Sequence, residues 1–514
     1  MPEYLHPGVY VEEVGSGPRP IEGVSTSTAG FLGATERGPL RPTLLTCYRE
    51  YVRWFGGEAG PDRHLPYAAR GFFENGGQRL YVCRIVNAVA TVASAAFGPH
   101  FRVQAIGPGN WGRRLYAGIA DSSGAVQGPH GARPVGFRLR LAYYAKPPSG
   151  DPLDWFSGLA NASVPDVAED FDDLALDPAA PNYWGKRLEE STLARLVRSP
   201  SAPAGASPKR GCRQLRQGGA SGAGLRVADF EGHETQRRHE VQGLLALASD
   251  RCRDVSLVYA PGVPADVARK VVSHCETLRY RFALVDGPAS SPAGFEPRVA
   301  IADSSHAAHY TPWLVVADLA DGTQTRTVPP GGHVAGVYVR TDLERGVHKA
   351  PANQGLRGAL AVTEQVTDAE QERLNPRGIN VLREFPGRGL LVWGARTLSS
   401  EPLWKYVSIR RLFIFIERSI DEGTDWVVFE HNDEPLWTRV ISAIRNFLRS
   451  VWREGALAGQ TEDDAFFVRC DRTTMTQDDI LNGRLICEIG VAVVRPAEFI
   501  ILRFGRRTVE ADQA

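Results

Sequence analysis

The chain begins with a short run that can form a β-strand but cannot be stable as one by itself. Val9, Tyr10 and Val11 lie in this β-prone run, which a Pro-Gly pair precedes and Gly/Pro-rich residues 15–20 follow. A lone strand leaves its backbone hydrogen-bonding groups unsatisfied. We therefore expect residues 1–28 to be an extended arm and linker whose strand joins a sheet formed elsewhere.

The length of 514 residues requires more than one hydrophobic core. Single cores stop growing near roughly 250 to 300 residues, so two or three domains are expected. The chain is 43% hydrophobic and 23% charged, which is typical of a folded protein and not of a disordered or fibrous one.

The charge balance argues against polyanionic partners. Lys plus Arg and Asp plus Glu both number 59, so the chain lacks the long-range attraction that draws proteins to nucleic acid or anionic lipid. No stretch of about 18 apolar residues and no basic, apolar leader occurs. We expect no nucleic-acid partner, no direct membrane insertion and no cleaved signal.

The cysteines are odd in number, scattered, and never spaced as C-x-x-C, which disfavours a disulfide framework or a zinc ribbon. Reduced thiols in a cytoplasmic protein are the expectation. The seven are Cys47, Cys83, Cys212, Cys252, Cys275, Cys470 and Cys487.

Residues 29–97 and 226–374 predict a middle α/β domain. Two apolar runs, 255–260 and 281–286, flank a helical pattern over 265–278. This order predicts a β-α-β unit and hence a parallel sheet.

Residues 98–225 are rich in Gly, Pro, Ser and Arg and predict an inserted, partly β outer module, in which residues 201–224 form a long mobile loop. Residues 375–514 form the expected C-terminal domain, with a strand pair near its start at 379–383 and 389–394. The predicted fold class is multidomain α/β and α+β.

One motif matches a dinucleotide fingerprint, Gly107-Pro108-Gly109-Asn110-Trp111-Gly112. The fingerprint works only where a strand runs into a helix, because the helix N-terminus binds the pyrophosphate. The residues that follow predict a strand, and Trp111 would block the phosphate. A structural turn is the interpretation, with no cofactor expected.

His306 and His309 lie three residues apart beside Ser304 and Ser305, which could suggest a metal pair or a Ser-His dyad. Ordinary core or surface histidines are more common. No zincin, nucleophile-elbow or P-loop motif is present in the sequence. We therefore expect no catalytic or metal site and no enzymatic activity.

A long amphipathic helix is predicted to start after Asn432 or Asp433, either of which is a good N-cap. Its apolar residues recur every three or four positions and define one face. Four arginines fall in an adjacent arc of roughly 120°. The alternatives are a solvated face and a binding stripe, made by Arg439, Arg445, Arg449 and Arg453.

Several ordered segments resemble the tail sheath family of contractile phages and related injection systems. Near the N-terminus these are residues 7–13 and 18–27, and in the middle residues 328–336 and 346–353. Toward the C-terminus they are residues 375–380, 394–398, 404–407 and 495–499.

This resemblance implies an inner domain built from the N- and C-terminal segments, with the middle region projecting outward. It implies a structural sheath subunit that polymerises into a helical tube around an inner tube and contracts to drive that tube through an envelope. The implied partners are further copies of the chain, the inner tube protein, and baseplate and terminator or cap proteins. Assembly in the bacterial cytoplasm would precede incorporation into a phage tail or tail-like particle. The alternatives are a sheath-like terminator or baseplate component, and an α/β hydrolase.

The terminal strands fit this hypothesis. Residues 9–14 and 499–504 could each add to the sheet edge of a neighbouring copy. The expected inter-subunit residues are Val9, Tyr10, Val11, Phe499, Ile501 and Leu502. The arginine stripe is expected to face the inner tube. Residues 200–225 match no segment of the family, and the sequence assigns them no role.

Overall fold

The computed structural model describes residues 20–57, 60, 63–128, 131–134, 136–232, 241–289 and 302–498. The chain divides into two compact units. Unit 2 comprises Ser25–Arg410, and unit 1 comprises the segment before Ser25 together with the chain from Arg411 onward.

Unit 2 is built on a nine-stranded sheet with the order β18-β21-β20-β15-β14-β13-β1-β3-β2. The six strands from β20 to β3 are parallel, and β2, β21 and β18 add antiparallel edges. The strands are β1 (Thr28–Gly33), β2 (Thr43–Leu45), β3 (Arg79–Arg84), β13 (Leu257–Tyr259), β14 (Phe282–Asp286), β15 (Ala307–Thr311), β18 (Gln354–Gly355), β20 (Ile379–Phe385) and β21 (Gly389–Val392). The predicted β-α-β unit is confirmed as β13, α7 (Ala265–Leu278) and β14.

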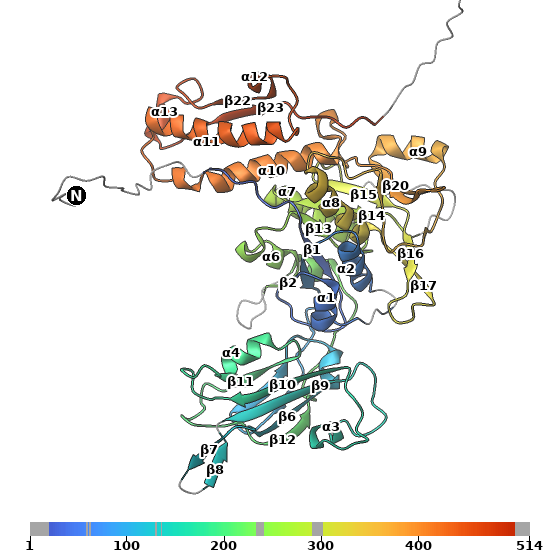
Figure 1. Ribbon diagram of the computed structural model, residues 1–514, viewed down its shortest axis with the longest axis vertical. Coiled ribbons are helices and arrows are strands. Elements are labelled where there is room, and N and C mark those ends of the chain that lie inside the picture. The colour runs from blue at the N-terminus through green and yellow to red at the C-terminus, as the bar shows by residue number, and fades with distance from the viewer. Residues whose placement is uncertain are drawn as a thin grey trace, which may run out of the picture. The chain divides into compact units, whose positions relative to one another are not determined.

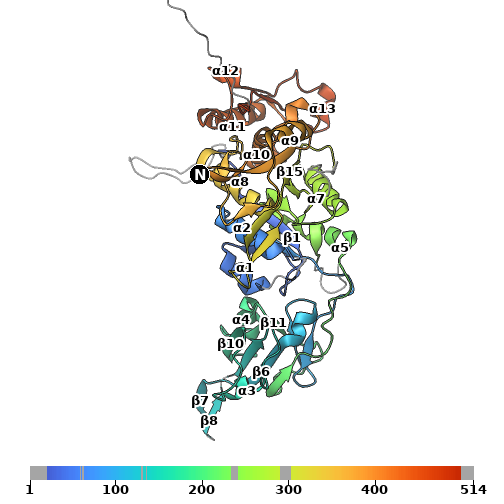
Figure 2. The same cartoon turned by 90° about the vertical axis from the view of Figure 1, so that its right-hand side faces the viewer.

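Helices cover both faces of this sheet (Figure 2). On one face lie α2 (Leu65–Glu74) and α8 (Gly331–Arg345), and on the other lie α5 (Val227–Glu231), α6 (Gly243–Leu247) and α7. Successive residues of β1 show why both layers form, because side chains of a strand alternate between faces. The Phe31 ring packs 5.4 Å from that of Phe72 in α2, whereas Leu32 joins the core beneath α5, α6 and α7.

The β20–β21 hairpin is confirmed as a strand pair, but it lies in unit 2. β20 pairs in parallel with β15, with His309 opposite Ile379, so its backbone completes the large sheet. The division between the units therefore falls at Arg411 and not near Asn375, where the sequence suggested a boundary. Unit 2 also contains α1 (Tyr48–Phe55), α9 (Asp368–Leu374) and a small sheet of β17 (Thr325–Val328), β16 (Leu314–Ala317) and β19 (Ala361–Val362).

The segment between β3 and α5 forms two antiparallel sheets around a shared core. One contains β4 (Ser94–Ala96), β5 (Phe101–Ala105) and β11 (Ala194–Arg198). The other contains β6 (Leu115–Asp121), β9 (Phe137–Tyr143), β10 (Val167–Leu174) and β12 (Gly211–Gln214). A hairpin of β7 (Ala125–Gly128) and β8 (Gly131–Pro134) and two short helices, α3 (Asp154–Ser157) and α4 (Trp184–Arg187), complete it.

The expectation of a long mobile loop over residues 201–224 was wrong for its centre. β12 pairs with β6, with Cys212 opposite Gly118. The end of the segment is also held, because Thr91 N donates to Ala220 O at 2.8 Å and Asn87 Nδ2 donates to Gly224 O at 3.0 Å. The glycine-rich composition concealed this ladder, since a strand needs only its backbone to pair.

Helix α10 (Val407–Gly423) begins in unit 2 and continues into unit 1 from Arg411. The other elements of unit 1 are α11 (Glu434–Arg453), α12 (Glu462–Ala465), β22 (Phe466–Arg469), α13 (Gln477–Leu481) and β23 (Glu488–Val491). Within this unit, α11 lies along the two strands (Figure 1). The predicted start of α11 is confirmed, because the Asp433 carboxylate accepts a hydrogen bond from Leu436 N at 3.0 Å. The predicted apolar face is buried at Trp437, Val440, Ile444, Phe447, Leu448 and Val451, and half-buried at Ile441.

Two glycines four residues apart allow α8 to pack closely on α2. A Cβ atom on Gly332 would lie 2.5 Å from Ala68 Cα, and one on Gly336 would lie 2.4 Å from Phe72 O. Both contacts are with backbone atoms, which cannot rotate away. This approach gives residues 328–336, one of the segments that carry the family resemblance, a packing role.

We expect Gly336→Ala to lower the free energy of unfolding of unit 2 by about 1 to 3 kcal/mol, because the added methyl group overpacks the α2–α8 contact. This outweighs the gain in helix propensity, which is at most about 1 kcal/mol. Urea unfolding followed by circular dichroism measures the change. Gly322→Ala is the matched control, since nothing lies within 4 Å of a Cβ there. Equal midpoints for G336A and wild type would contradict this packing role.

Candidate functional site

The residues expected to bind neighbouring copies fall outside the described chain. Val9, Tyr10 and Val11 precede its first residue, and Phe499, Ile501 and Leu502 follow its last one. The structure does describe the residues from which both segments leave, and these lie in unit 1.

The base of the N-terminal arm is anchored on α10. Val24 N donates a hydrogen bond to Ser419 Oγ at 3.1 Å, and Ile21 is buried. Two glycines permit the contact. A Cβ on Gly23 would lie 2.9 Å from the Phe415 ring, and one on Gly423 would lie 2.7 Å from the Ile21 side chain. No local sequence pattern reveals this anchor, because Gly23 and Gly423 lie four hundred residues apart in the numbering.

β22 and β23 form a two-stranded antiparallel sheet, with Phe466 opposite Val491 and Arg469 opposite Glu488. Ala492 N donates to Ala465 O at 2.8 Å, so this pair is of the hydrogen-bonded type. Because the two types alternate along an antiparallel ladder, the backbone groups of Ile489 point away from β22.

Both outer edges of this sheet are unpaired within the described part of the chain. A sheet of only two strands is marginally stable in water, and α11 covers one of its faces (Figure 1). Exposed N–H and C=O groups along the edges can accept a further strand. The hairpin is therefore a candidate receptor for an extended segment of another chain.

Three of the four arginines of α11 form ion pairs within unit 1. Arg439 pairs with Glu430 at 3.1 Å and lies over the Trp426 ring at 5.4 Å. Glu430 and Trp426 belong to the connection between α10 and α11, which the helical pattern did not reveal.

Arg445 and Arg449 share the carboxylate of Glu462, the first residue of α12. The nitrogen–oxygen distances are 3.0 Å and 2.7 Å, and Arg445 also reaches Asp463 at 3.3 Å. The hydrogen bond from Arg449 is the main cause that holds the pKa of the Glu462 carboxyl below its usual range. These ion pairs stabilise the start of α12, and both arginine side chains remain partly exposed.

Arg453 differs from the other three. It is the last residue of α11 and is exposed, and no ion pair joins it to any residue that the structure describes. Among the residues that the structure describes, the stripe thus has one arginine without an ion pair and three that are partly neutralised. A contact with an acidic surface would depend first on Arg453.

The dinucleotide-like motif is a structural turn, as expected. Residues Asn110–Arg114 form a single 3₁₀ turn that leads into β6, not a long helix. Trp111 is buried, and its Nε1 donates to Pro108 O at 3.0 Å. A Cβ on Gly107 would lie 2.1 Å from Gly38 O, so this glycine permits backbone contact within the protein and no phosphate is needed to explain it.

His306 and His309 do not converge. His309 lies in β15 and is fully buried, which lowers its pKa to about 4. His306 Nε2 contacts Arg410 Nη2 at 2.9 Å, and burial lowers its pKa to about 4 as well. Both rings are therefore neutral near pH 7. Within the described residues, no cluster of three or more His, Cys, Asp or Glu side chains could hold a metal ion.

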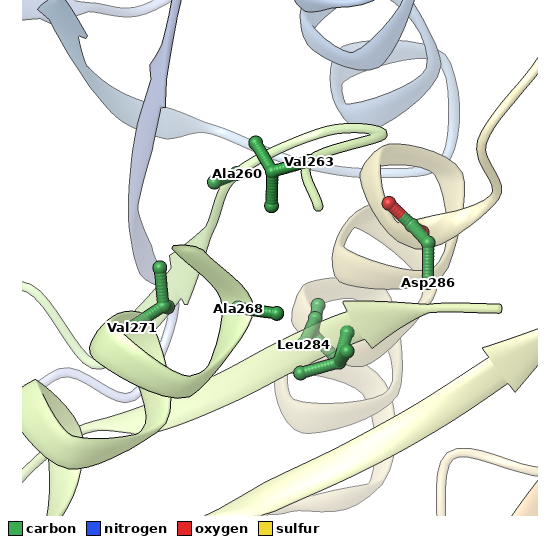
Figure 3. Close-up of a pocket in the computed structure, with 7 residues that line it drawn as sticks. Ala260, Val263, Ala268, Val271, Leu284 and Asp286 are labelled. Carbon is green, nitrogen blue, oxygen red and sulfur yellow. The ribbon is translucent and has the colours of Figure 1, made fainter. Parts of the chain in front are cut away.

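A small pocket lies at the carboxyl ends of β13 and β14, beneath α7 (Figure 3). In α/β folds, ligands usually bind at the carboxyl ends of the strands beside the point where the strand order reverses, which here falls between β1 and β13. The pocket is one strand away from that point, and its volume of about 10 Å³ is roughly the room for one water molecule. Figure 3 shows that small apolar side chains and Asp286 line it.

The Asp286 carboxylate has a structural role, because hydrogen bonds from within the fold occupy it. It accepts hydrogen bonds from Tyr259 Oη at 2.8 Å and from the backbone N–H groups of Gly262 and Gly331, both at 3.0 Å. Gly331 is the first residue of α8, where a negative charge is favourable. Burial raises the Asp286 pKa to about 6. Its hydrogen bonds hold the strand ends to the start of α8 and leave little capacity for a substrate.

No helix in the described ranges has both the length and the apolar character needed to cross a membrane.

Family comparison matches two consecutive stretches of the chain. Residues 243–398 match the phage tail sheath protein central domain, and residues 399–505 match the phage tail sheath C-terminal domain. A putative prophage major tail sheath protein of Pseudomonas aeruginosa is 27% identical over 271 residues, which is 50% of this chain and 67% of that protein.

Solved structures extend the similarity over the whole chain. A sheath complex of the PVC extracellular contractile injection system, in the contracted state, is 25% identical and has a TM-score of 0.58, with 99% of each chain covered. A chain in the baseplate of the anti-feeding prophage is also 25% identical, with a TM-score of 0.54 and coverage of 98% of this chain and all of that one.

We expect Ser419→Ala to speed amide hydrogen exchange at Val24 by about tenfold, because the N–H loses its acceptor and the arm base opens more often. Ser450→Ala is the matched control. Ser419 and Ser450 both donate to a carbonyl of their own helix at 2.6 Å, but Ser450 does not hold the arm. Unchanged exchange at Val24 in the S419A protein would show that the anchor does not depend on this bond.

Proposed function

Because this chain belongs to the contractile tail sheath family, a family of structural subunits in phage tails and contractile injection systems, we propose that it polymerises into a helical sheath held together by exchanged terminal strands. The observation that carries the proposal is the β22–β23 hairpin, whose two outer edges pair with no other strand in the described part of the chain. It lies in the unit that also anchors the base of the N-terminal arm.

The chemistry of the two ends supports strand exchange. Residues 9–14 and 499–504 are β-prone, and each is joined to unit 1 by a short segment. An arm that leaves one copy can add to the hairpin edge of the next copy by backbone hydrogen bonds. Such a contact uses two different surfaces, so it propagates along a helix and need not close on itself.

Contraction then requires that the subunits pack in two different arrangements while the same arm contacts persist. The exchanged arms would keep the chains linked while the packed surfaces change partners. The subunit itself needs no nucleotide for this change, in line with the filled turn at Gly107 and the small pocket at Asp286. We therefore propose a structural and not a catalytic role.

The inner tube is the proposed partner of the α11 stripe, now centred on Arg453. No described residue forms an ion pair with Arg453, whereas an acidic partner of Arg445 or Arg449 would have to compete with Glu462. Exposed ion pairs contribute little each and are screened by salt. Many such contacts along a tube could hold it in register and still release it.

A sheath-like baseplate or terminator component is the second candidate, because one of the similar chains belongs to a baseplate. The purified protein distinguishes the two. A sheath subunit should form long tubes, and a terminator should stop at a ring or remain a monomer.

We predict that deleting residues 1–14 abolishes tubes in negative-stain micrographs while the protein stays folded by circular dichroism. The reason is the loss of an added strand worth about 1 kcal/mol per hydrogen bond.

Ile489→Pro tests the edge of β23 on the receiving hairpin. It should also reduce tube growth, since proline removes the outward N–H and is tolerated on an edge strand. Ile489→Val, which keeps that N–H, should assemble normally. Tubes of normal length from both the deletion and I489P would refute strand exchange.

We predict that Arg453→Glu weakens co-sedimentation with the inner tube protein roughly two- to fivefold at low salt, the range expected of one exposed ion pair. Glu462→Gln should strengthen it, because Arg445 and Arg449 lose their competing acid. Arg472→Glu, an exposed charge reversal on the loop after β22, is the control. If R453E and E462Q both bind like wild type, the stripe is a solvated face.

A further inference from the structure

Two cysteines that are distant in the sequence lie opposite each other at the end of the β22–β23 ladder. Arg469 is paired with Glu488, so the next step of the same register places Cys470 opposite Cys487. Both thiols are free, and they are close enough that each affects the pKa of the other. The intervening residues 471–486 contain α13, which is why no short cysteine spacing appears in the sequence.

The position of the two cysteines in the antiparallel ladder favours a disulfide between them. Ala465 and Ala492 are a hydrogen-bonded pair, and the two types alternate, so Cys470 and Cys487 fall at a non-hydrogen-bonded position. At such positions the Cα atoms of facing residues are about 4.5 Å apart and their side chains are closest. Disulfides span Cα separations of about 4.4 to 6.8 Å. Facing cysteines at a position of this type thus fall within the range that a disulfide can span.

The other cysteines do not offer an equivalent site. Cys83, Cys252 and Cys275 are buried in the core beneath α5, α6 and α7, where an oxidant has no access. Cys47 and Cys212 are exposed, and Cys212 lies on β12 opposite Gly118. Cys470 is buried, but Cys487 is half-buried and so gives access to the pair.

We propose that Cys470 and Cys487 form a reversible redox site, which a low-molecular-weight disulfide such as oxidised glutathione converts into a cross-strand disulfide. The Cys487 thiolate attacks the glutathione disulfide, releases one reduced glutathione and forms a mixed disulfide. The Cys470 thiolate then attacks the Cys487 sulfur and releases the second glutathione. One Sγ–Sγ bond forms, two protein thiols are oxidised, and one glutathione disulfide is reduced.

The surroundings of the two thiols slow their oxidation, so the pair stays reduced during a brief exposure to an oxidant. Burial raises the pKa of the Cys487 thiol to about 12 and also raises that of Cys470. The carboxylates of Glu488 and Asp471, the charged groups acting on the two thiols, raise the pKa values further. Since only the thiolate reacts, exchange is slow near pH 7 and about tenfold faster for each added pH unit.

The bond would close residues 471–486 into a loop and fix the register of β22 against β23. This consequence rests on the proposed function, in which that hairpin receives arms from neighbouring copies. A particle assembled in the reducing bacterial cytoplasm would carry the open pair, and one released into an oxidising medium would acquire the bond. The sheath would thus gain its covalent support after assembly.

The site is tested on the purified, reduced full chain, before any assembly, so that the result does not depend on the sheath proposal. The protein is incubated with oxidised glutathione at about pH 8.5, then digested with trypsin and mapped by mass spectrometry. We expect a Cys470–Cys487 linked peptide, lighter than its reduced parts by two hydrogens. Cleavage after Arg472 or Arg484 should leave the fragments joined on a non-reducing gel until reductant is added.

Hydrogen exchange provides a second measurement. Oxidation should slow exchange of the β22 and β23 amides by about tenfold or more, because the closed loop restricts opening of the hairpin. Cys487→Ser should lose both effects, whereas Cys212→Ser should keep both. Glutathione adducts only on Cys47 or Cys212, or a linkage that joins other cysteines but not this pair, would overturn the proposal.

Discussion

The pairing of β1 with strands on both of its sides is the interaction on which the rest of unit 2 depends. Ala29 lies opposite Leu80 of β3 on one side and Leu257 of β13 on the other. All six residues of β1 are buried. The strand therefore joins two parts of the chain that the β-rich module separates in sequence. Without it, β3 and β13 would present two open edges of parallel sheet.

The same arrangement explains how a large module can be inserted into a regular α/β fold. The chain leaves after β3 and returns at α5, and these two points are held side by side. Ala88 N donates to the Asp229 carboxylate at 3.0 Å, and Thr91 N donates to Ala220 O at 2.8 Å. The module has its own core, so its insertion does not disturb the packing of the sheet.

Unit 1 contains the three features on which the proposed function depends. It anchors the base of the N-terminal arm, carries the open hairpin and bears the arginine stripe. A two-stranded sheet supported by one long helix is adaptable, because additional strands can complete it at low cost. That property suits the proposed sheath, in which contacts between subunits would hold in more than one arrangement. The ion pairs that Arg445 and Arg449 form with Glu462 also stabilise α12 within the same unit.

The sequence by itself determined the elements whose signals are local. The start of α11, its apolar face and the β13-α7-β14 unit follow from capping residues and from periodicity. Resemblance to known sequence motifs indicated the family. Only the tertiary structure decided how distant segments meet: β20 joins the large sheet, Glu462 neutralises Arg445 and Arg449, and Cys470 faces Cys487. The physical reason is that strand pairing and ion pairing join residues far apart in the chain, and no local pattern records which partner a strand edge or a charge will find.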